Sequence, residues 1–360
     1  TIVGNGQNVK NEILNDTAYY IWKVTYPINT YNITFYLGNF QKIQDTYTGI
    51  NGKKLLLNYY VLEYNYQNAL THFKQVKKHI NVYEELFGDY PWYNDGFKLI
   101  ESPYAGMEHQ TAIAYGNGYK NDLYGYDDYI ILHETGHEWF GNAITASDLC
   151  DVWLQEGFTT YAEALYLEKA YNVDYALRHL IIYRWTIKNK RPLVGPAGRR
   201  YFDYNDGDVY VKGAWVLHSL RTTINDDQQF FSILKVFFKE HKLKTSSSKD
   251  FIQTTNLVTQ KNYDWFFNQY LYKREVPFFE YYLAKDGYLY YRWIYTEDSF
   301  DKLPVRINYA GKSYDIFPTT NIERINSLEN NQIVGTFNID NSYALFGLCE
   351  YKNLQKMFFK

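Results

Sequence analysis

The stretch ILHETGHEWFGN, residues 131–142, contains the pattern His-Glu-x-x-His. On a helix, His133 and His137 are four residues apart, so both side chains project from one face, one turn apart. This spacing allows two imidazole nitrogens to reach one zinc ion at about 2.0–2.1 Å. Glu134 would then lie beside the metal, where it can take a proton from a bound water. Taken alone the motif is a weak signal, because three fixed positions also occur by chance in helices that bind no metal.

Neighbouring segments favour a metal site over a pair of structural histidines. The preceding stretch YDDYIIL (126–132) is acidic and then apolar, which is typical of a buried helix, and WFGN (139–142) adds two large aromatic side chains. The polar residues of a buried helix need partners. The two histidines are therefore expected to bind something.

A second helix is predicted from WLQEGFTTYAE (153–163), and it presents Glu156. Eighteen residues separate Glu156 from His137, enough to finish one helix, turn and begin the next. Zinc needs a third protein ligand, and a site with an open fourth position is catalytic. His133, His137 and Glu156 are therefore the predicted metal ligands. Glu163, on the same helical face, is either an acceptor for a ligand imidazole or an exposed or salt-bridged side chain.

Composition argues against several classes of partner. The chain of 360 residues has 37 Lys plus Arg against 40 Asp plus Glu, a net charge of −3, which disfavours nucleic acid or an anionic membrane as the main partner. It has no run of 18 apolar residues, so no transmembrane helix is predicted. The 40 tyrosines are spread along the whole chain, which fits half-buried filler better than an aromatic binding surface. Cys150 and Cys349 are predicted to be packed thiols, although one disulfide is also compatible with the sequence.

The first part of the chain has the texture of β structure. Residues 1 to about 57 mix alternating and continuous apolar residues around turn signals at Asn29 and Gly38. An Asn-Gly-Lys turn follows at 51–53. These residues are predicted to form strands.

Helical periodicity begins near residue 65. A helix is predicted over 65–87, with Gly88 as its stop. Further helices are predicted at 127–144, 151–171, 174–190, 209–224, 227–241, 248–257 and 262–272. From 277 onward the pattern returns to strands, with hairpins predicted at the Lys-Asp-Gly (285–287) and Ala-Gly-Lys (310–312) turns.

Several motifs together resemble one family. The order His-Glu-x-x-His, eighteen residues and Glu, with WFGN after the second His and EGF from Glu156, resembles the zinc aminopeptidases of the aminopeptidase N and leukotriene hydrolase family, a gluzincin group. GMEHQTAIAYGN (106–117) resembles that family's Gly-x-Met-Glu-Asn strand. YVKGAWVLHSL (210–220) resembles its Tyr-x-Lys-Gly segment. The resemblance is strong over about 58–277 and fainter on both flanks.

The resemblance implies a multidomain α+β fold. A thermolysin-like zinc metallopeptidase catalytic domain is expected at 58–277, flanked by the C-terminal part of a saddle-like N-terminal β domain at 1–57 and by a small β-sandwich at 278–360. In the family the N-terminal β domain supplies a further Gln or Glu beside the substrate amino group, and this sequence has no such motif. An upstream segment is expected to be missing.

The resemblance also implies a set of site residues around one zinc ion. Glu134 is the implied general base, and Tyr210 is the implied hydrogen-bond donor to the oxyanion. Glu108 is implied to hold the α-ammonium group of the substrate by a charge-assisted hydrogen bond. His109 replaces the family's Asn, which leaves the role of that position open. The residues implied to line the extended substrate are Ala105, Gly106 and Met107.

The predicted function is hydrolysis of peptides with a free N-terminus by a zinc aminopeptidase. Two alternatives stay open: an endopeptidase, and a scaffold or binding protein that kept the fold but lost catalysis. Glu108 argues against the first, and the complete set of ligands, base and tyrosine argues against the second. The preferred N-terminal side chain depends on loops such as 195–208, and a periplasmic, secreted or cytoplasmic location is equally compatible with the sequence.

Overall fold

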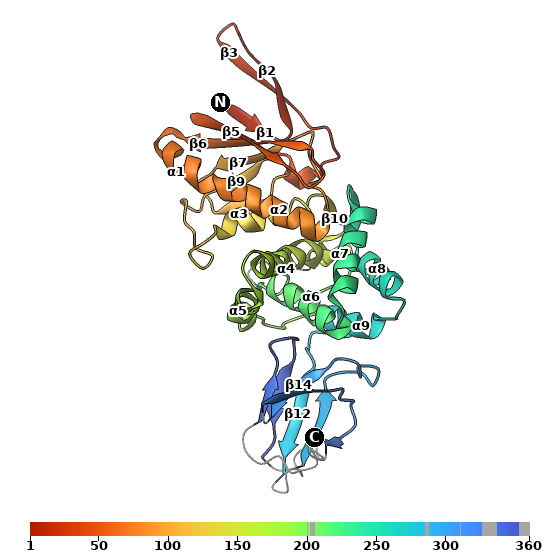
Figure 1. Ribbon diagram of the computed structural model, residues 1–360. Helices are drawn as coiled ribbons and strands as arrows, with labels where there is room; N and C mark the ends of the chain where they lie inside the picture. Colours follow the sequence, from red (N-terminus) through yellow and green to blue (C-terminus); the bar gives the residue numbers. More distant parts are fainter. Residues whose placement is uncertain (200, 202–205, 285–287, 310, 326–336, 353–360) are drawn as a thin grey trace. The chain divides into compact units, whose positions relative to one another are not determined.

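The computed structural model describes residues 1–199, 201, 206–284, 288–309, 311–325 and 337–352. These residues pack into two compact units, each with helices and strands (Figure 1). Unit 1 comprises residues 1–147, 154–176 and 231–247, and unit 2 comprises 148–153, 177–230 and the described residues from 248 onward. The predicted mixture of α and β structure is confirmed, whereas the domain bounds at 57 and 277 stay a prediction.

A five-stranded sheet lies at the centre of unit 1. Its strands, in spatial order, are β5 (Phe40–Thr48), β6 (Lys54–Leu62), β7 (Phe97–Glu101), β9 (Ile113–Tyr115) and β8 (Gly106–Met107). β5 and β6 form the hairpin expected around the turn at 51–53. β6, β7 and β9 run parallel, and β8 pairs antiparallel with β9. The segment implied to bind substrate is therefore the edge strand of this sheet.

The strands predicted within the first 57 residues are present, with one correction. β1 (Ile2–Gly4) pairs with β4 (Phe35–Leu37), and β2 (Gln7–Leu14) forms a hairpin with β3 (Thr17–Lys23). Just before β4, however, Thr30–Asn32 form a 3-10 helical turn instead of a strand. Asn29 caps this turn, because its side-chain oxygen accepts a hydrogen bond from Asn32 N at 3.1 Å. The local side-chain bond outcompetes strand pairing here.

The helix predicted over 65–87 is present but interrupted. α1 (Tyr66–His72) and α2 (Val76–Phe87) are joined by a 3-10 turn at Phe73–Gln75. Gly88 ends α2 with φ of 115°, a conformation that glycine adopts without a steric penalty. The predicted stop is confirmed.

The helix predicted at 127–144 is shorter than expected. α3 spans Tyr129–Gly136, and the residues after it form wide turns in which the N–H groups of residues 142–144 donate to carbonyls five positions back at 3.0–3.2 Å. Gly141 has a backbone φ of 130°, which residues other than glycine rarely adopt. The backbone conformation at this glycine is incompatible with a helix that continues to the predicted residue 144.

Four further elements contribute to unit 1: α4 (Trp153–Ala170), the C-terminal part of α7 (Asp227–His241), β10 (Ile144–Ala146) and β11 (Lys244–Ser246). α4 and α7 correspond to the helices predicted at 151–171 and 227–241. Phe158 on α4 packs against Phe140 and Phe237, with ring centroids 5.0 and 5.8 Å apart. These contacts fix α4 against the segment that follows α3.

Unit 2 contains the other predicted helices. They are most of α5 (Val173–Arg184), together with α6 (Val211–Ile224), α8 (Ser248–Thr259) and α9 (Asp264–Tyr272). α5 ends at Arg184, before the predicted residue 190, and the N–H groups of Lys188 and Asn189 donate to the Asp208 carboxylate at 2.8 and 2.9 Å instead of to helix carbonyls. Asn189 also has φ of 48°, in the left-handed region. In the described part of the chain, no helix is both long and apolar enough to cross a membrane.

The C-terminal strands of unit 2 form two sheets. One has the order β16 (Glu323–Ile325), β13 (Leu289–Ile294), β12 (Phe278–Leu283), β18 (Gly347–Glu350), and the other β15 (Lys312–Ile316), β14 (Val305–Tyr309), β17 (Phe337–Asp340). The two predicted hairpins are confirmed as β12–β13 and β14–β15, although their turn residues 285–287 and 310 lie outside the described residues. Residues 200 and 202–205 of the loop 195–208 also lie outside them. Cys150 and Cys349 are free thiols, as expected.

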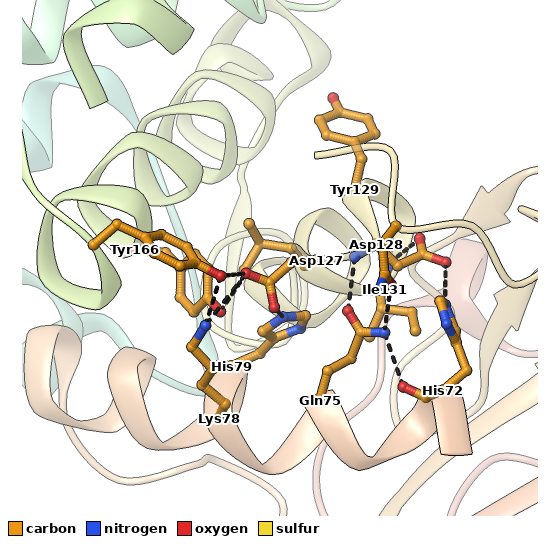
Figure 2. Close-up of polar contacts among 12 residues, drawn as sticks. His72, Gln75, Lys78, His79, Asp127, Asp128, Tyr129, Ile131 and Tyr166 are labelled. Atoms are coloured by element: carbon orange, nitrogen blue, oxygen red, sulfur yellow. Dashed lines mark hydrogen bonds and ion pairs between the residues drawn. The ribbon is translucent and has the colours of Figure 1, made fainter. Parts of the chain in front are cut away.

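Two consecutive carboxylates anchor the start of α3 (Figure 2). Asp128 is completely buried and caps the helix, since its Oδ1 accepts hydrogen bonds from Ile130 N and Ile131 N at 2.9 and 3.3 Å. Its Oδ2 accepts from His72 Nε2 and Tyr115 OH, both at 2.7 Å. The cap therefore ties α3 to α1 and to β9.

Asp127 ties the same point to α2 and α4. Its Oδ2 accepts hydrogen bonds from Tyr166 OH at 2.9 Å and Tyr171 OH at 2.5 Å, and its Oδ1 lies 3.4 Å from His79 Nε2. Burial raises the pKa of Asp127, but the hydrogen bond and charge of His79 outweigh it and lower the pKa overall. The carboxylate stays ionised, and α3 is held between its neighbours from its first turn.

We expect Asp128→Ala to lower the free energy of unfolding by about 2–4 kcal/mol, because it removes a helix cap and leaves buried donors on His72 and Tyr115 without their acceptor. Urea unfolding followed by circular dichroism measures this loss. Asp122→Ala is the matched control: this exposed carboxylate accepts from Tyr129 N at 3.0 Å at the same helix end. Equal losses in the two variants would contradict the anchoring role of Asp128.

Candidate metal centre

Five side chains from α3 and α4 converge in the interior of unit 1. α3 and its C-terminal cap present His133, Glu134 and His137, and α4 presents Glu156 and Glu163. The spacing of four residues places His133 and His137 on one helical face, and the spacing of seven does the same for Glu156 and Glu163. All five side chains are buried, with at most 8% of any residue exposed. Five ionisable groups in one dry region require compensating interactions.

Three of these side chains form a triangle of potential metal-binding atoms. His133 Nε2 lies 3.1 Å from His137 Nε2. Glu156 Oε2 lies 3.3 Å from His137 Nε2 and 3.9 Å from His133 Nε2. Ligand atoms at about 2.0–2.1 Å from a tetrahedral zinc ion are roughly 3.3 Å apart. Two imidazoles and one carboxylate at these distances fit a zinc ion and leave a fourth position for another ligand.

The outer ring nitrogens of the two histidines fix their tautomers. His133 Nδ1 lies 2.5 Å from Glu163 Oε1, and His137 Nδ1 lies 2.9 Å from the carbonyl oxygen of Phe140. A carboxylate and a carbonyl only accept hydrogen bonds, so each Nδ1 carries a hydrogen and each Nε2 is the nitrogen that faces the triangle and can bind a metal when it is unprotonated. Glu163 is buried, so the alternative of an exposed Glu163 is wrong.

The triangle requires a positive charge. Glu156 Oε2 is buried, and apart from its ion pairs with the two histidines it has no hydrogen-bond partner among the described residues. Burial lowers the pKa of His137, but the carboxylates of Glu156 and Glu108 outweigh it and raise the pKa to about 10. A proton on His137 or a metal ion between the three atoms satisfies this demand. The metal ion is the better match, because it uses all three atoms at once.

Glu134 lies beside the triangle and close to a second carboxylate. Ligand atoms of Glu108, Glu134 and His137 all lie within 4.8 Å of one another. Burial raises the pKa of Glu134 to about 7. A carboxylate with a pKa near neutrality can both accept and return a proton near pH 7.

β8 passes so close to α3 that a side chain at its first position is excluded. A Cβ atom on Gly106 would lie 2.8 Å from Ile130 Cγ2 and would overlap Glu134 Oε1. Gly106 and Met107 are half-buried, and the preceding Ala105 is exposed. The structure thus brings the backbone of Gly106 and Met107 next to Glu134.

Glu108 directly follows β8 and is almost completely buried, at 8% exposure. Its carbonyl oxygen accepts a hydrogen bond from Asn142 Nδ2 at 2.8 Å. The neighbouring His109 is half-buried, and its Nδ1 lies 2.7 Å from Tyr36 OH on β4. The His that replaces the family's Asn is therefore in contact with the N-terminal strands.

Tyr210 belongs to unit 2, where it is half-buried and immediately precedes α6. The segment that follows is well fixed: Lys212 is buried and its Nζ donates to the carbonyl oxygen of Arg274 at 3.0 Å, and Gly213 N donates to the carbonyl oxygen of Asp208 at 3.1 Å. Burial lowers the pKa of Lys212 to about 8. The role of Tyr210 in the reaction stays a prediction.

Sequence reasoning missed four polar residues around this site: Tyr31, Glu138, Asn142 and Gln155. Tyr31 OH lies 3.3 Å from Glu108 Oε1 and 3.1 Å from Gln155 Nε2. Glu138 Oε1 accepts from the backbone N–H of Thr111 at 2.8 Å. Three of them, Glu138, Asn142 and Gln155, lie inside or next to the zinc motifs. Their position in the sequence could therefore have indicated that they lie near the site. Nothing in the sequence distinguishes Tyr31 from the other tyrosines.

A family model for the peptidase family M1 domain matches residues 71–270. The chain belongs to the M1 peptidase family. Its members are zinc aminopeptidases, so the resemblance stated from the motifs is confirmed.

Curated M1 relatives share modest identity with this chain. Aminopeptidase B of Homo sapiens is 27% identical over 190 residues, which cover 47% of this chain and 28% of that protein. Aminopeptidase N of Escherichia coli (strain K12) is 24% identical over an alignment 401 residues long. The alignment covers 100% of this chain and 45% of that protein. The chain thus spans less than half the length of either relative.

Solved M1 structures share its fold. Legionella pneumophila aminopeptidase A, in complex with aspartic acid, has a TM-score of 0.77 at 17% identity and covers 99% of this chain and 44% of its own. A mutant M1 zinc metallopeptidase from Deinococcus radiodurans, bound to a Tyr-Ser-Ala substrate, has a TM-score of 0.62 at 18% identity. The match covers 77% of this chain and 62% of that chain. The mixed α+β architecture is therefore that of M1 enzymes.

We expect Glu163→Gln to weaken zinc affinity about 10-fold or more, because an amide holds the ligand imidazole of His133 less firmly than a carboxylate does. Competition with a chromogenic chelator measures the affinity. Glu168→Gln, on the same helix and only partly buried, is the control and should leave the affinity unchanged. Unaltered zinc affinity in Glu163→Gln would show that this contact does not support a metal site.

Proposed function

We propose that this M1 family member is a zinc-dependent aminopeptidase that hydrolyses the N-terminal bond of peptides. The observation that carries the proposal is the position of Glu108, whose carboxylate lies within 4.8 Å of both Glu134 and His137. An acceptor for an ammonium group thus lies directly beside a base and a candidate metal site. Such a constellation suits cleavage at a chain end that carries a positive charge.

His133, His137 and Glu156 are the proposed ligands of one zinc ion. The chemistry that bound zinc supplies in such a site is Lewis-acid activation of the scissile carbonyl and of a water molecule. The converging Nε2 atoms of the two histidines, and the buried Oε2 of Glu156 that faces them, support this assignment. Glu163 and the Phe140 carbonyl hold the imidazoles in the tautomer that can bind a metal.

Glu134 is the proposed general base. It takes a proton from the attacking water and returns it to the leaving amine. Burial raises its pKa, which makes the carboxylate a stronger proton acceptor than an exposed glutamate. Its Oε2 makes no hydrogen bond with the described residues, which leaves an acceptor available for a water.

Glu108 is the proposed anchor of the substrate α-ammonium group. The edge of β8 offers the backbone groups of Gly106 and Met107 to an extended peptide, with Ala105 at the outer end. A substrate that continued beyond this point, as an endopeptidase requires, would bury the Glu108 carboxylate against a neutral chain. That burial is unfavourable, because a buried charge needs a partner.

Tyr210 is the proposed hydrogen-bond donor to the substrate carbonyl oxygen as negative charge develops on it. Its support is the Tyr-x-Lys-Gly pattern and the well-ordered start of α6, where Lys212 and Gly213 are fixed by backbone carbonyls.

The purified chain is expected to cleave a peptide with a free N-terminus and to lose activity when a chelator removes zinc. N-acetylation of the same peptide removes the charge that Glu108 binds and should lower kcat/KM at least 100-fold. Mass spectrometry of the products and metal analysis of the protein check both points. Equal cleavage of the acetylated peptide would favour an endopeptidase, and absence of zinc with absence of cleavage would favour a scaffold.

We expect Glu134→Gln to reduce kcat by about 100- to 10,000-fold, because the amide preserves the shape of the side chain but cannot accept the proton. Bound zinc, measured by atomic absorption, should be unchanged. Glu85→Gln, on the outer side of α2, serves as the control with normal activity. An active Glu134→Gln variant would rule out Glu134 as the base.

A further inference from the structure

The 3-10 turn at Thr30–Asn32 lies against the segment that follows α3. Asn29 Nδ2 donates to Thr145 Oγ1 at 3.1 Å, and Asn32 Nδ2 donates to Asn142 Oδ1 at 2.5 Å. Asn32 is completely buried. These bonds join residues more than 100 positions apart and hold the turn in one place within unit 1.

The turn presents Tyr31 to two residues of the candidate site. Gln155 Oε1 accepts a hydrogen bond from Ala146 N at 3.0 Å, so the amide nitrogen of Gln155 must face the other way. That nitrogen donates to Tyr31 OH at 3.1 Å. Since the hydroxyl oxygen accepts from Gln155, its hydrogen is free to be donated to Glu108 Oε1 at 3.3 Å.

The Tyr31 hydroxyl remains a donor over the whole working range of pH. Tyr31 is 41% exposed, but desolvation of its hydroxyl and the negative charges of Glu108 and Glu156 raise its pKa above the ordinary value for tyrosine. An uncharged donor orients the Glu108 carboxylate without neutralising it. A lysine or arginine at this place would compete with a substrate ammonium group for the same oxygens.

The same network also holds the backbone of Glu108. Asn142 Nδ2 donates to the carbonyl oxygen of Glu108 at 2.8 Å, while its Oδ1 accepts from Asn32. Glu108 is thus fixed twice, at its backbone through Asn142 and at its carboxylate through Tyr31. The second contact matters because the carboxylate also lies within 4.8 Å of ligand atoms of Glu134 and His137, towards which an unrestrained side chain could rotate.

We propose that Tyr31 is a positioning residue that sets the orientation of the Glu108 carboxylate for the α-ammonium group of the substrate. This inference rests on the proposed aminopeptidase function and names a residue, outside every zinc motif, that supports recognition of the amino end. Tyr31 acts only through Glu108. Its removal therefore affects ligands that carry an α-amino group and spares ligands that lack it.

The test is a pair of small hydroxamates bound to the zinc-loaded full chain. Alanine hydroxamate carries the α-amino group, and propanohydroxamate is the same molecule without it. Isothermal titration calorimetry gives both dissociation constants. We expect Tyr31→Phe to raise the dissociation constant of alanine hydroxamate about 10-fold, because one hydrogen bond to a charged group is lost. The dissociation constant of propanohydroxamate should not change.

Two further variants sharpen the result. Tyr19→Phe, a half-exposed tyrosine on the β2–β3 hairpin, controls for the loss of a hydroxyl and should change neither constant. Gln155→Met removes the donor that orients Tyr31, so it should weaken alanine hydroxamate in the same direction. Combined with Tyr31→Phe it should add no further loss, because both substitutions break one chain of hydrogen bonds.

The outcomes separate this inference from the function on which it rests. If the unmodified protein prefers alanine hydroxamate but Tyr31→Phe weakens both compounds equally, or neither, Tyr31 has no positioning role while the aminopeptidase proposal stands. If the unmodified protein binds the two compounds equally well, recognition of the amino group itself is absent. In that case the proposed function fails, and the role of Tyr31 falls with it.

Discussion

The close approach of three buried, potentially metal-binding atoms is the constraint around which the interior of unit 1 is arranged. Two imidazole nitrogens and a carboxylate oxygen lie 3.1–3.9 Å apart in the interior, an arrangement that a proton or a metal ion between them stabilises. Their neighbours prevent relaxation. Asp127 and Asp128 fix the start of α3, and Glu163 and the Phe140 carbonyl fix the two rings. Several buried polar groups hold these side chains in an arrangement that does not favour folding by itself, as expected for a functional centre.

A close approach between β8 and α3 connects this centre to the edge strand. Because Gly106 has no Cβ, the backbone of β8 can lie against Glu134, and Glu108 follows immediately. The 3-10 turn that carries Tyr31 then contacts Glu108 from the N-terminal strands. The proposed metal ligands, base and amine anchor thus come from separate segments that converge within one compact unit. The M1 fold brings these segments together, and the side chains at their meeting point make it a site.

The sequence predicted the long periodic helices well and their ends less well. α7 has the predicted bounds, because a continuous amphipathic pattern is a local property. α3 and α5 end early for reasons that lie outside such patterns: a wide turn at Gly141 with φ of 130°, and an Asp208 carboxylate that captures the N–H groups of Lys188 and Asn189. Residues 30–32 form a turn instead of a strand, because Asn29 offers a side-chain acceptor.

By itself the sequence determined the types and spacing of the candidate zinc ligands His133, His137 and Glu156, and of Glu163 beside them, since the separation of His133 from His137 and of Glu156 from Glu163 follows helical periodicity. Motif order also led to the M1 family, a conclusion that the family match confirms. Only the tertiary structure decided which other residues meet this centre. Tyr31 contacts Glu108 and Gln155 across 77 and 124 positions of the chain, and no local pattern encodes such a contact. Helical periodicity in a sequence predicts which residues share a face over one or two turns. A hydrogen bond between distant segments forms only once the whole unit has packed.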